Sequence, residues 1–351
     1  MSQPLRVGIV GAGFGASTHL PALRAHERFE VVALASPNRA SAIAAEQKVA
    51  QAFDSAATML AGSELDAVVV ASPPFSHHAD VLAALRAGKH VLCEKPFALD
   101  VAQAEEMLAA AKQAGTACGV AHEFRFLPQR IALAELLANG HLAQLREIEY
   151  THLMRFLRTD GRRARGWWFE RARGGGLAGA ILSHAIDAAN ALVGEAPRRA
   201  IGLLRTANPS RRDDRGEFVS DVDDGAFALL EYRDGIVARL SIDGTAAVES
   251  LTLALHAEGR TAVTSGASLA EQRLFSVDDD ETNELDCAPS RYARFGSING
   301  NVPPMMELYD AWLARIDALG ASQTPATAMP LPSFSDALAT QHVLAAVGYG
   351  K

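Results

Sequence analysis

Two short segments carry residue types that could bind and act on a cofactor. Residues 11–16 read Gly-Ala-Gly-Phe-Gly-Ala and directly follow an apolar stretch, and residues 94–96 read Glu-Lys-Pro after another. An acid beside an amine forms an ionisable pair, and the proline keeps Lys95 out of the α region. The first segment is typical of a dinucleotide-binding turn. The second, by itself, is more typical of a surface lysine at the end of a strand.

The glycine-rich segment fits the G-x-G-x-x-[G/A] pattern of dinucleotide-binding turns, in the expected place between a strand and a helix. A first glycine allows the tight turn, and a second lets the backbone approach a pyrophosphate. A small sixth residue permits close packing of helix on strand. The N-terminus of the helix favours negative charge. The residues predicted to contact the cofactor here are Gly11, Ala12, Gly13, Phe14 and Gly15.

The end of the second expected strand indicates which dinucleotide is preferred. An acid at this place would bind the ribose 2′-hydroxyl of NAD, but residues 35–39 read Ala-Ser-Pro-Asn-Arg. Ser36 and Arg39 are instead suited to a 2′-phosphate, so the sequence favours NADP, with NAD possible. The alternative is that Arg39 is only a solvated residue of the first helical turn.

Strands and helical patterns alternate over the first 120 residues, which predicts a doubly wound parallel sheet in an α/β Rossmann domain at residues 1–122. The strands are expected at residues 5–10, 30–35, 67–71, 90–92 and 117–121. Helical spacing of apolar residues occurs at 41–49, 78–87 and 101–114.

Beyond residue 122 several strand patterns follow one another directly. This arrangement predicts an α+β domain with a mostly antiparallel sheet at residues 123–351. The strands are expected at 146–155, 225–232, 236–243, 251–257 and 260–263, helices at 304–319 and 335–347, and long loops at 206–221 and 277–301.

The composition restricts the class of protein. A chain of 351 residues with 49% hydrophobic and 21% charged residues is typical of a two-domain globular protein. The net charge of −8 argues against nucleic acid as a partner. Three widely spaced cysteines give neither a disulfide framework nor a metal site. With no apolar run near the roughly 20 residues of a membrane span and no secretory segment, we expect a cytoplasmic protein without a membrane partner.

Several motifs in a fixed order resemble those of the glucose–fructose oxidoreductase, inositol dehydrogenase and rhizopine catabolism (Gfo/Idh/MocA) family, over nearly the whole chain. They are residues 11–16, Ser72-Pro73-Pro74 with His78, 87–91, 94–96, 125–128, 174–176 and 184–187. The resemblance implies a Rossmann domain followed by an open-faced sheet, one side lining the active site and the other making contacts in a homodimer or homotetramer. It also implies hydride transfer between tightly held NAD(P) and a sugar, inositol or related compound.

Carried over position by position, the resemblance implies that Lys95 touches and polarises the reacting oxygen and that His184 is the acid/base. Asp187, three residues on, falls on the same helical face and could orient His184. The chain departs from the family pattern at Ala180, where an acid is common. The remaining residues implied to contact cofactor are Ser72, Pro74, His78, Glu94, Lys95 and Arg125, and those implied to contact substrate are Lys95, His122, Trp167 and His184.

For three of these residues a purely structural role is an alternative. Arg125 could anchor the junction between domains, His122 is as typical of a structural position, and Trp167 could pack in the core. The sequence assigns no metal site.

The sequence and the resemblance together predict an NAD(P)-dependent oxidoreductase acting on a sugar, cyclitol or related secondary alcohol or ketone. One alternative is a redox-neutral enzyme that cleaves glycosides with tightly bound NAD, which the alanine at position 180 keeps open. The other is a non-catalytic dinucleotide sensor, which has no need of both Lys95 and His184.

Overall fold

The computed structural model describes residues 3–158, 163–278, 281–321 and 329–350. The chain divides into two compact units, one of Met1–Phe126 with Ser290–Leu338 and one of Leu127–Pro289 with Ala339–Lys351. The sequence assigned everything after residue 122 to the second domain. In the structure, by contrast, residues 290–338 return to the first unit.

The first unit holds a six-stranded parallel sheet in the order β3-β2-β1-β4-β5-β6, which confirms the predicted Rossmann architecture. Its strands are β1 (Leu5–Val10), β2 (Phe29–Ala35), β3 (Gln51–Phe53), β4 (Ala67–Val70), β5 (His90–Cys93) and β6 (Cys118–Val120). The central strands are continuously apolar because helices cover both faces of such a sheet. The edge strand β3 was not predicted, since its three residues form no apolar run and two of them are exposed.

Helices connect these strands and cover the sheet. They are α1 (Leu20–Ala25), α2 (Ala40–Glu46), α3 (Ala56–Gly62), α4 (Pro74–Arg86) and α5 (Val101–Ala114). Helix α8 (Val302–Ala321) comes much later in the chain and belongs to the same unit. The ends of α5 follow from its sequence: the Asp100 carboxylate accepts the Gln103 N–H at 2.8 Å, and Gly115 ends the helix with a φ of 65°.

Helix α8 belongs to the first unit because its aromatic side chains pack there. Trp312 stacks on Phe29 with ring centroids 5.9 Å apart, and its indole N–H donates to the Ala117 carbonyl at 3.1 Å. Tyr309 on the same helix lies against Phe29 as well. Phe29 and Trp312 are far apart in the sequence, so no local pattern indicates this packing.

The second unit is built on an eight-stranded sheet in the order β16-β15-β14-β13-β7-β12-β11-β8. Every neighbouring pair is antiparallel except β7 with β12, so the predicted mostly antiparallel sheet is confirmed. The strands are β7 (Leu145–Leu153), β8 (Arg199–Arg205), β11 (Gly225–Glu231), β12 (Val237–Asp243), β13 (Ser250–Ala257), β14 (Arg260–Gly266), β15 (Arg273–Asp278) and β16 (Glu281–Leu285).

The two predicted long loops contain strands. Residues 206–221 include a separate hairpin of β9 (Ser210–Asp213) and β10 (Gly216–Val219), and β16 lies within residues 277–301. Residues 279–280 of the second loop lie outside the described part. Charged and exposed side chains dominate these strands, so no apolar alternation marked them. The edge strand β8 was not predicted, and four of its seven residues are exposed.

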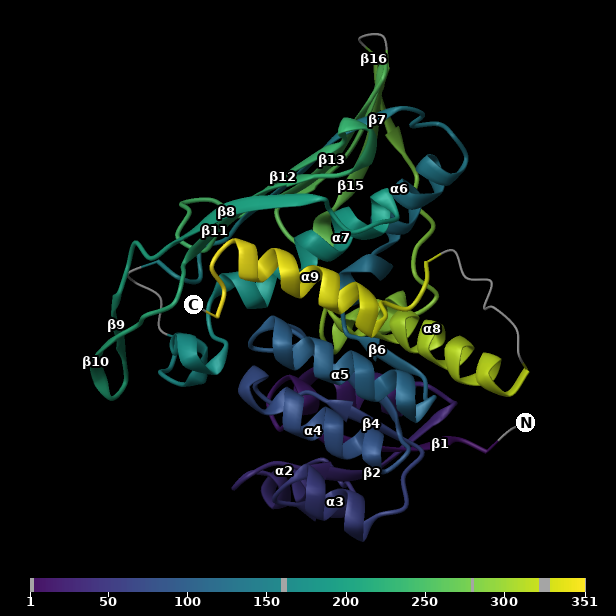
Figure 1. The fold of residues 1–351 in the computed structure, drawn as a ribbon, viewed down its shortest axis with the longest axis vertical. Helices are drawn as coiled ribbons and strands as arrows, with labels where there is room; N and C mark the ends of the chain where they lie inside the picture. Colours follow the sequence, from purple (N-terminus) through teal and green to yellow (C-terminus); the bar gives the residue numbers. More distant parts are fainter. Residues whose placement is uncertain (1–2, 159–162, 279–280, 322–328, 351) are drawn as a thin grey trace. The chain divides into compact units, whose positions relative to one another are not determined.

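One face of the eight-stranded sheet carries the core of the second unit. Side chains of α6 (Pro128–Ala138), α7 (Ser183–Val193) and the end of α9 (Phe334–Ala346) pack there, and Figure 1 shows α6 and α7 beside the strands. Among the described residues, one stretch, Arg171–Val193, has the length and apolar composition of a membrane span. Since 78% of its most apolar window is buried inside the protein, we assign it to the core.

Candidate active site

The glycine-rich turn after β1 has room for a cofactor. Gly11 has a φ of 116°, and a Cβ there would overlap the carbonyl of Ala71, so only glycine fits. A Cβ at Gly13, in contrast, meets nothing within 4 Å. A π-helical turn over Gly15–His19 follows, with no side-chain cap at its start. An open backbone beside a helix N-terminus fits the pyrophosphate of a dinucleotide.

Ser36 and Arg39 follow β2 at the same edge of the sheet, because all strands here run parallel. Ser36 is buried, and its N–H donates to the Phe53 carbonyl at 2.9 Å. Arg39 is exposed at the start of α2, and its guanidinium makes no bond to the described residues. Its charge is therefore available to a phosphate.

Glu94 and Lys95 directly follow β5 at this edge, and the Glu94 side chain is held by hydrogen bonds. His19 donates its Nε2–H to the Glu94 carboxylate at 2.9 Å, and its Nδ1 accepts from the Tyr309 hydroxyl at 2.7 Å. Burial alone raises the pKa of Glu94, but His19 and Lys95 outweigh burial and hold that pKa below its usual range. The carboxylate also accepts the Lys95 N–H at 3.1 Å, which fixes the main chain of Lys95.

His19 and Tyr309 were not selected from the sequence. His19 sits four residues after the glycine turn, and Tyr309 comes from α8, which was assigned to the other domain. The only sequence signal for His19 is that it lies one helical turn after Gly15, so the two residues share one face of the helix.

Two adjacent histidines of α4 differ in placement. His78 is partly exposed and pairs with the Glu106 carboxylate at 2.8 Å. His77 is buried, with its ring nitrogens 2.7 Å from the Ser72 carbonyl and 3.0 Å from the Pro96 carbonyl. Burial lowers the pKa of His77. His77 thus connects two of the recognised segments, whereas the sequence selected His78.

Ser72 and Pro74 lie where β4 leads into α4. The Ser72 hydroxyl donates to the Asp80 carboxylate at 2.7 Å, and burial raises the pKa of Asp80. Pro74 is buried at the first position of α4, where its missing N–H costs nothing.

His122 and Arg125 follow β6 and are buried, at 1% and 4% exposure. Arg125 lies in the short helical turn Glu123–Phe126, and its guanidinium is 3.7 Å from the Asp336 carboxylate. The candidate site residues of this unit therefore all follow the carboxyl ends of strands in one parallel sheet: the glycine turn, Ser36, Ser72, Lys95 and His122. Open α/β sheets bind ligands at this edge.

His184 and Asp187 belong to the second unit. Both lie on α7, one turn apart, and are almost fully buried at 2% and 1% exposure. A π-helical turn, Ala178–Leu182, precedes α7 and contains Ala180, where the family pattern has an acid. Trp167 is partly buried against the core, beside Trp168, which packs against Phe156 and Phe169.

The first unit can bind a dinucleotide and present an ammonium, and the second presents an imidazole and a carboxylate on one helix face. An ammonium can polarise an oxygen, and an imidazole can take up or release a proton. Among the described residues no group of three His, Cys, Asp or Glu side chains is arranged to hold a metal ion.

Comparisons with known proteins identify the family of the chain. Residues 5–122 match the model of the oxidoreductase family with an NAD-binding Rossmann fold, and residues 131–263 match the Gfo/Idh/MocA C-terminal domain. An uncharacterised oxidoreductase of Synechocystis is 30% identical over 327 residues, covering 90% of this chain and 88% of its own.

Two further similarities extend the comparison. The D-glucoside 3-dehydrogenase of Escherichia coli is 30% identical over 246 residues, covering 67% of this chain and 68% of its own. The crystal structure of an oxidoreductase domain protein from Kribbella flavida superposes with a TM-score of 0.85 at 24% identity, covering 99% of this chain and 97% of that one. The chain belongs to the Gfo/Idh/MocA family of oxidoreductases, with an NAD-binding Rossmann domain as its first unit.

Proposed function

We propose that this oxidoreductase transfers a hydride between NAD(P) and a secondary alcohol or ketone of a sugar, cyclitol or related compound. The observation that carries the proposal is the fixing of Lys95 by a buried carboxylate at the ligand-binding edge of the first sheet. The similarity to D-glucoside 3-dehydrogenase supports a carbohydrate substrate.

The chain's own residues provide binding and proton transfer, while the nicotinamide supplies the hydride chemistry when bound. Residues 11–15 hold the pyrophosphate, and Ser72, Pro74 and Arg125 lie along the same edge of the sheet. His77 is better placed than His78 to support them, because it contacts the Ser72 carbonyl. Arg39 and Ser36 take the 2′-phosphate, so NADP is the preferred cofactor.

Lys95 donates a hydrogen bond to the reacting oxygen and polarises it. This residue follows β5, and its main-chain N–H is held by the Glu94 carboxylate. His184 takes the proton when an alcohol is oxidised and returns it when a ketone is reduced, and Asp187 orients its ring. His122 and Trp167 complete the substrate contacts.

An absorbance screen of sugars, cyclitols and their keto forms, run with NAD and NADP in parallel, tests the proposal. We expect turnover with at least one compound and a loss of about 10³-fold in kcat for Lys95→Ala. Cofactor affinity should change less than a few fold. Wild-type turnover by Lys95→Ala would refute the role of Lys95.

The same samples also distinguish other activities. Release of the leaving alcohol from a glycoside without net absorbance change would replace the dehydrogenase with a redox-neutral glycoside-cleaving enzyme. Cofactor binding without turnover of either kind would favour a dinucleotide sensor.

We also propose that the uncovered face of the eight-stranded sheet contacts a second copy of the chain. Ile201, Leu203 and Leu229 are 49%, 58% and 43% exposed there and line a groove of about 470 Å³. Arg239 pairs with Glu147 and Glu149 at the side of the groove. Exposed apolar patches of this kind mark interaction surfaces. Light scattering should show an oligomer that Leu203→Glu dissociates; an unchanged mass would refute the contact.

A further inference from the structure

The helix that carries His184 and Asp187 needs an acceptor for its first N–H groups, which have no partner inside a helix. The residue before its π-helical turn is Leu177, which has no side chain able to cap it. The preceding residues, Gly174, Gly175 and Gly176, have no polar side chain either. The acceptor must come from elsewhere in the fold.

Asp223 supplies it from the strand side. Its carboxylate accepts the Ala178 N–H at 2.7 Å, and its main-chain carbonyl accepts the Leu177 N–H at 3.4 Å. Asp223 is 4% exposed and stands just before β11. A carboxylate at a helix N-terminus also interacts favourably with the helix dipole.

Two of the glycines at residues 174–176 allow close packing at this contact. Gly176 has a φ of 99°, and a Cβ there would overlap the Asp223 Oδ1. A Cβ at Gly175 would overlap the Trp168 carbonyl. Two of the three glycines are therefore required by close approach, one of them by the carboxylate itself.

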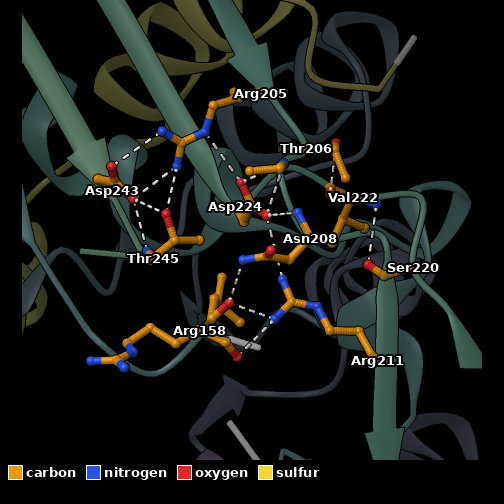
Figure 2. A network of polar contacts seen from close by, with 12 residues as sticks. Arg158, Arg205, Thr206, Asn208, Arg211, Ser220, Val222, Asp224, Asp243 and Thr245 are labelled. Atoms are coloured by element: carbon orange, nitrogen blue, oxygen red, sulfur yellow. Dashed lines mark hydrogen bonds and ion pairs between the residues drawn. The ribbon is translucent and has the colours of Figure 1, made fainter. Parts of the chain in front are cut away.

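The residues next to Asp223 hold it in place. The Asp224 carboxylate accepts the N–H groups of Ala207 and Asn208 at 2.7–3.0 Å. It also pairs with Arg205 and Arg211, as Figure 2 shows. Asp224 thus ties the start of β11 to the segment leading to β9. Asp223 has little freedom to move.

The far end of β11 makes a second contact with the same helix. The Tyr232 hydroxyl, one residue after β11, donates to the Asn190 side-chain oxygen at 2.7 Å. The helix is thus attached to one strand near both of its ends, with His184 and Asp187 between the two contacts.

We propose that Asp223 is the positioning residue of the His184–Asp187 helix, setting where these two side chains lie through its bond to the first helical turn. The inference rests on the proposed function for its catalytic consequence. Its structural part, the anchoring of residues 177–187, is independent of any activity. Asp223 itself touches no reacting group in this scheme.

The experiment compares Asp223→Ala, Asp223→Asn and the matched control Asp221→Ala. Asp221 also caps a backbone N–H, that of Arg171 at 2.8 Å, but it is exposed and lies outside the His184 helix. Hydrogen exchange of the peptide covering residues 177–187 is measured in each full-length variant. The kcat, KM and cofactor Kd are measured on the same samples.

We expect Asp223→Ala to speed exchange in this peptide and to lower kcat about 10²-fold, the scale of a displacement of about 1 Å, with cofactor Kd within threefold of wild type. Asp223→Asn keeps an oxygen acceptor and should restore kcat to within about fivefold. Asp221→Ala should match wild type in both measurements.

Wild-type exchange and kcat in Asp223→Ala would overturn the proposal, as would equal losses in Asp223→Ala and Asp223→Asn. If Asp223→Ala does not fold, Gly176→Ala replaces it, since the added Cβ displaces the carboxylate while leaving it in the chain. Faster exchange in a protein whose wild type has no turnover would keep the anchoring and refute only the proposed function.

Discussion

The glycine-rich turn at residues 11–16 and the one at 174–178 both lead into a helix through a π-helical turn without a side-chain cap of its own. They differ in what meets the helix N-terminus. In the first unit the space beside Gly13 is open, whereas in the second the space beside Gly176 is filled by the Asp223 carboxylate. The first turn leaves room for an anion from outside, and the second holds the carboxylate of its own chain.

This difference separates binding from positioning. An open N-terminus gains its partner only when the cofactor arrives. A filled one is fixed in the folded chain and holds its helix whether or not a ligand is present. The same sequence signal, a cluster of glycines before a helix, therefore has two physical uses here.

A charged side chain placed in the open turn at Gly13 should have the largest effect, a loss of cofactor affinity. Gly13→Asp has room for its side chain, but its charge would lie beside the pyrophosphate, costing about 4 kcal/mol or roughly 10³-fold in cofactor Kd. Gly300→Asp, at another open glycine of the same unit, is the control. Calorimetric titration with NADP measures both, and an unchanged Kd in Gly13→Asp would place the pyrophosphate elsewhere.

The buried carboxylate should make stability depend on pH. Burial raises the pKa of Asp223 to about 6, against the opposing N–H bonds and Arg171. The folded state thus binds more protons than the unfolded chain between about pH 4 and pH 6, so this group lowers the free energy of unfolding as pH rises. Over two pKa units the loss is about 3 kcal/mol.

Asp223→Asn removes this titration. Its free energy of unfolding, relative to wild type, should rise by about 3 kcal/mol between pH 4 and pH 7 in urea titrations. Parallel curves for the two proteins would show that Asp223 is not a buried ionising group.

Filling the second turn should destabilise the fold without affecting cofactor binding. Gly176→Ala adds strain at positive φ and displaces the Asp223 carboxylate, at a cost of about 2 kcal/mol. Gly194→Ala, at the other end of the helix, has a φ of 80° and open space, so it reports strain alone. Equal losses of unfolding free energy in the two variants would mean that the carboxylate contact contributes nothing.

The smallest effect concerns Arg39, which we propose to bind the 2′-phosphate. Arg39→Ala should weaken NADP about 10-fold, near 1.4 kcal/mol, because a charge-assisted bond to the 2′-phosphate is lost. NAD serves as the internal control and should bind as before. Equal weakening of both cofactors would refute the 2′-phosphate role.

Local sequence patterns predicted most strands of the first unit and a smaller share of the strands of the second. The strands β1, β2, β4 and β5 are buried runs of apolar residues, so their existence and order followed from the sequence. The strands β9, β10 and β16 are made largely of exposed or charged residues. The edge strand β8 does contain apolar residues, at 200–204, and was missed all the same. Their pairing is decided by neighbouring strands, which a local pattern does not record.

The sequence by itself indicated the glycine turn and the strands that lead into it, because these are local patterns of few residues. The roles of Lys95, His184 and Asp187 came from the resemblance to a family and stay predictions. Only the tertiary structure decided that His19 and Tyr309 hold Glu94, that α8 packs in the first unit and that Asp223 holds the His184 helix. Each of these contacts joins residues 45 to 290 positions apart. Burial and hydrogen bonding select such partners in three dimensions, and spacing along the chain leaves no trace of them.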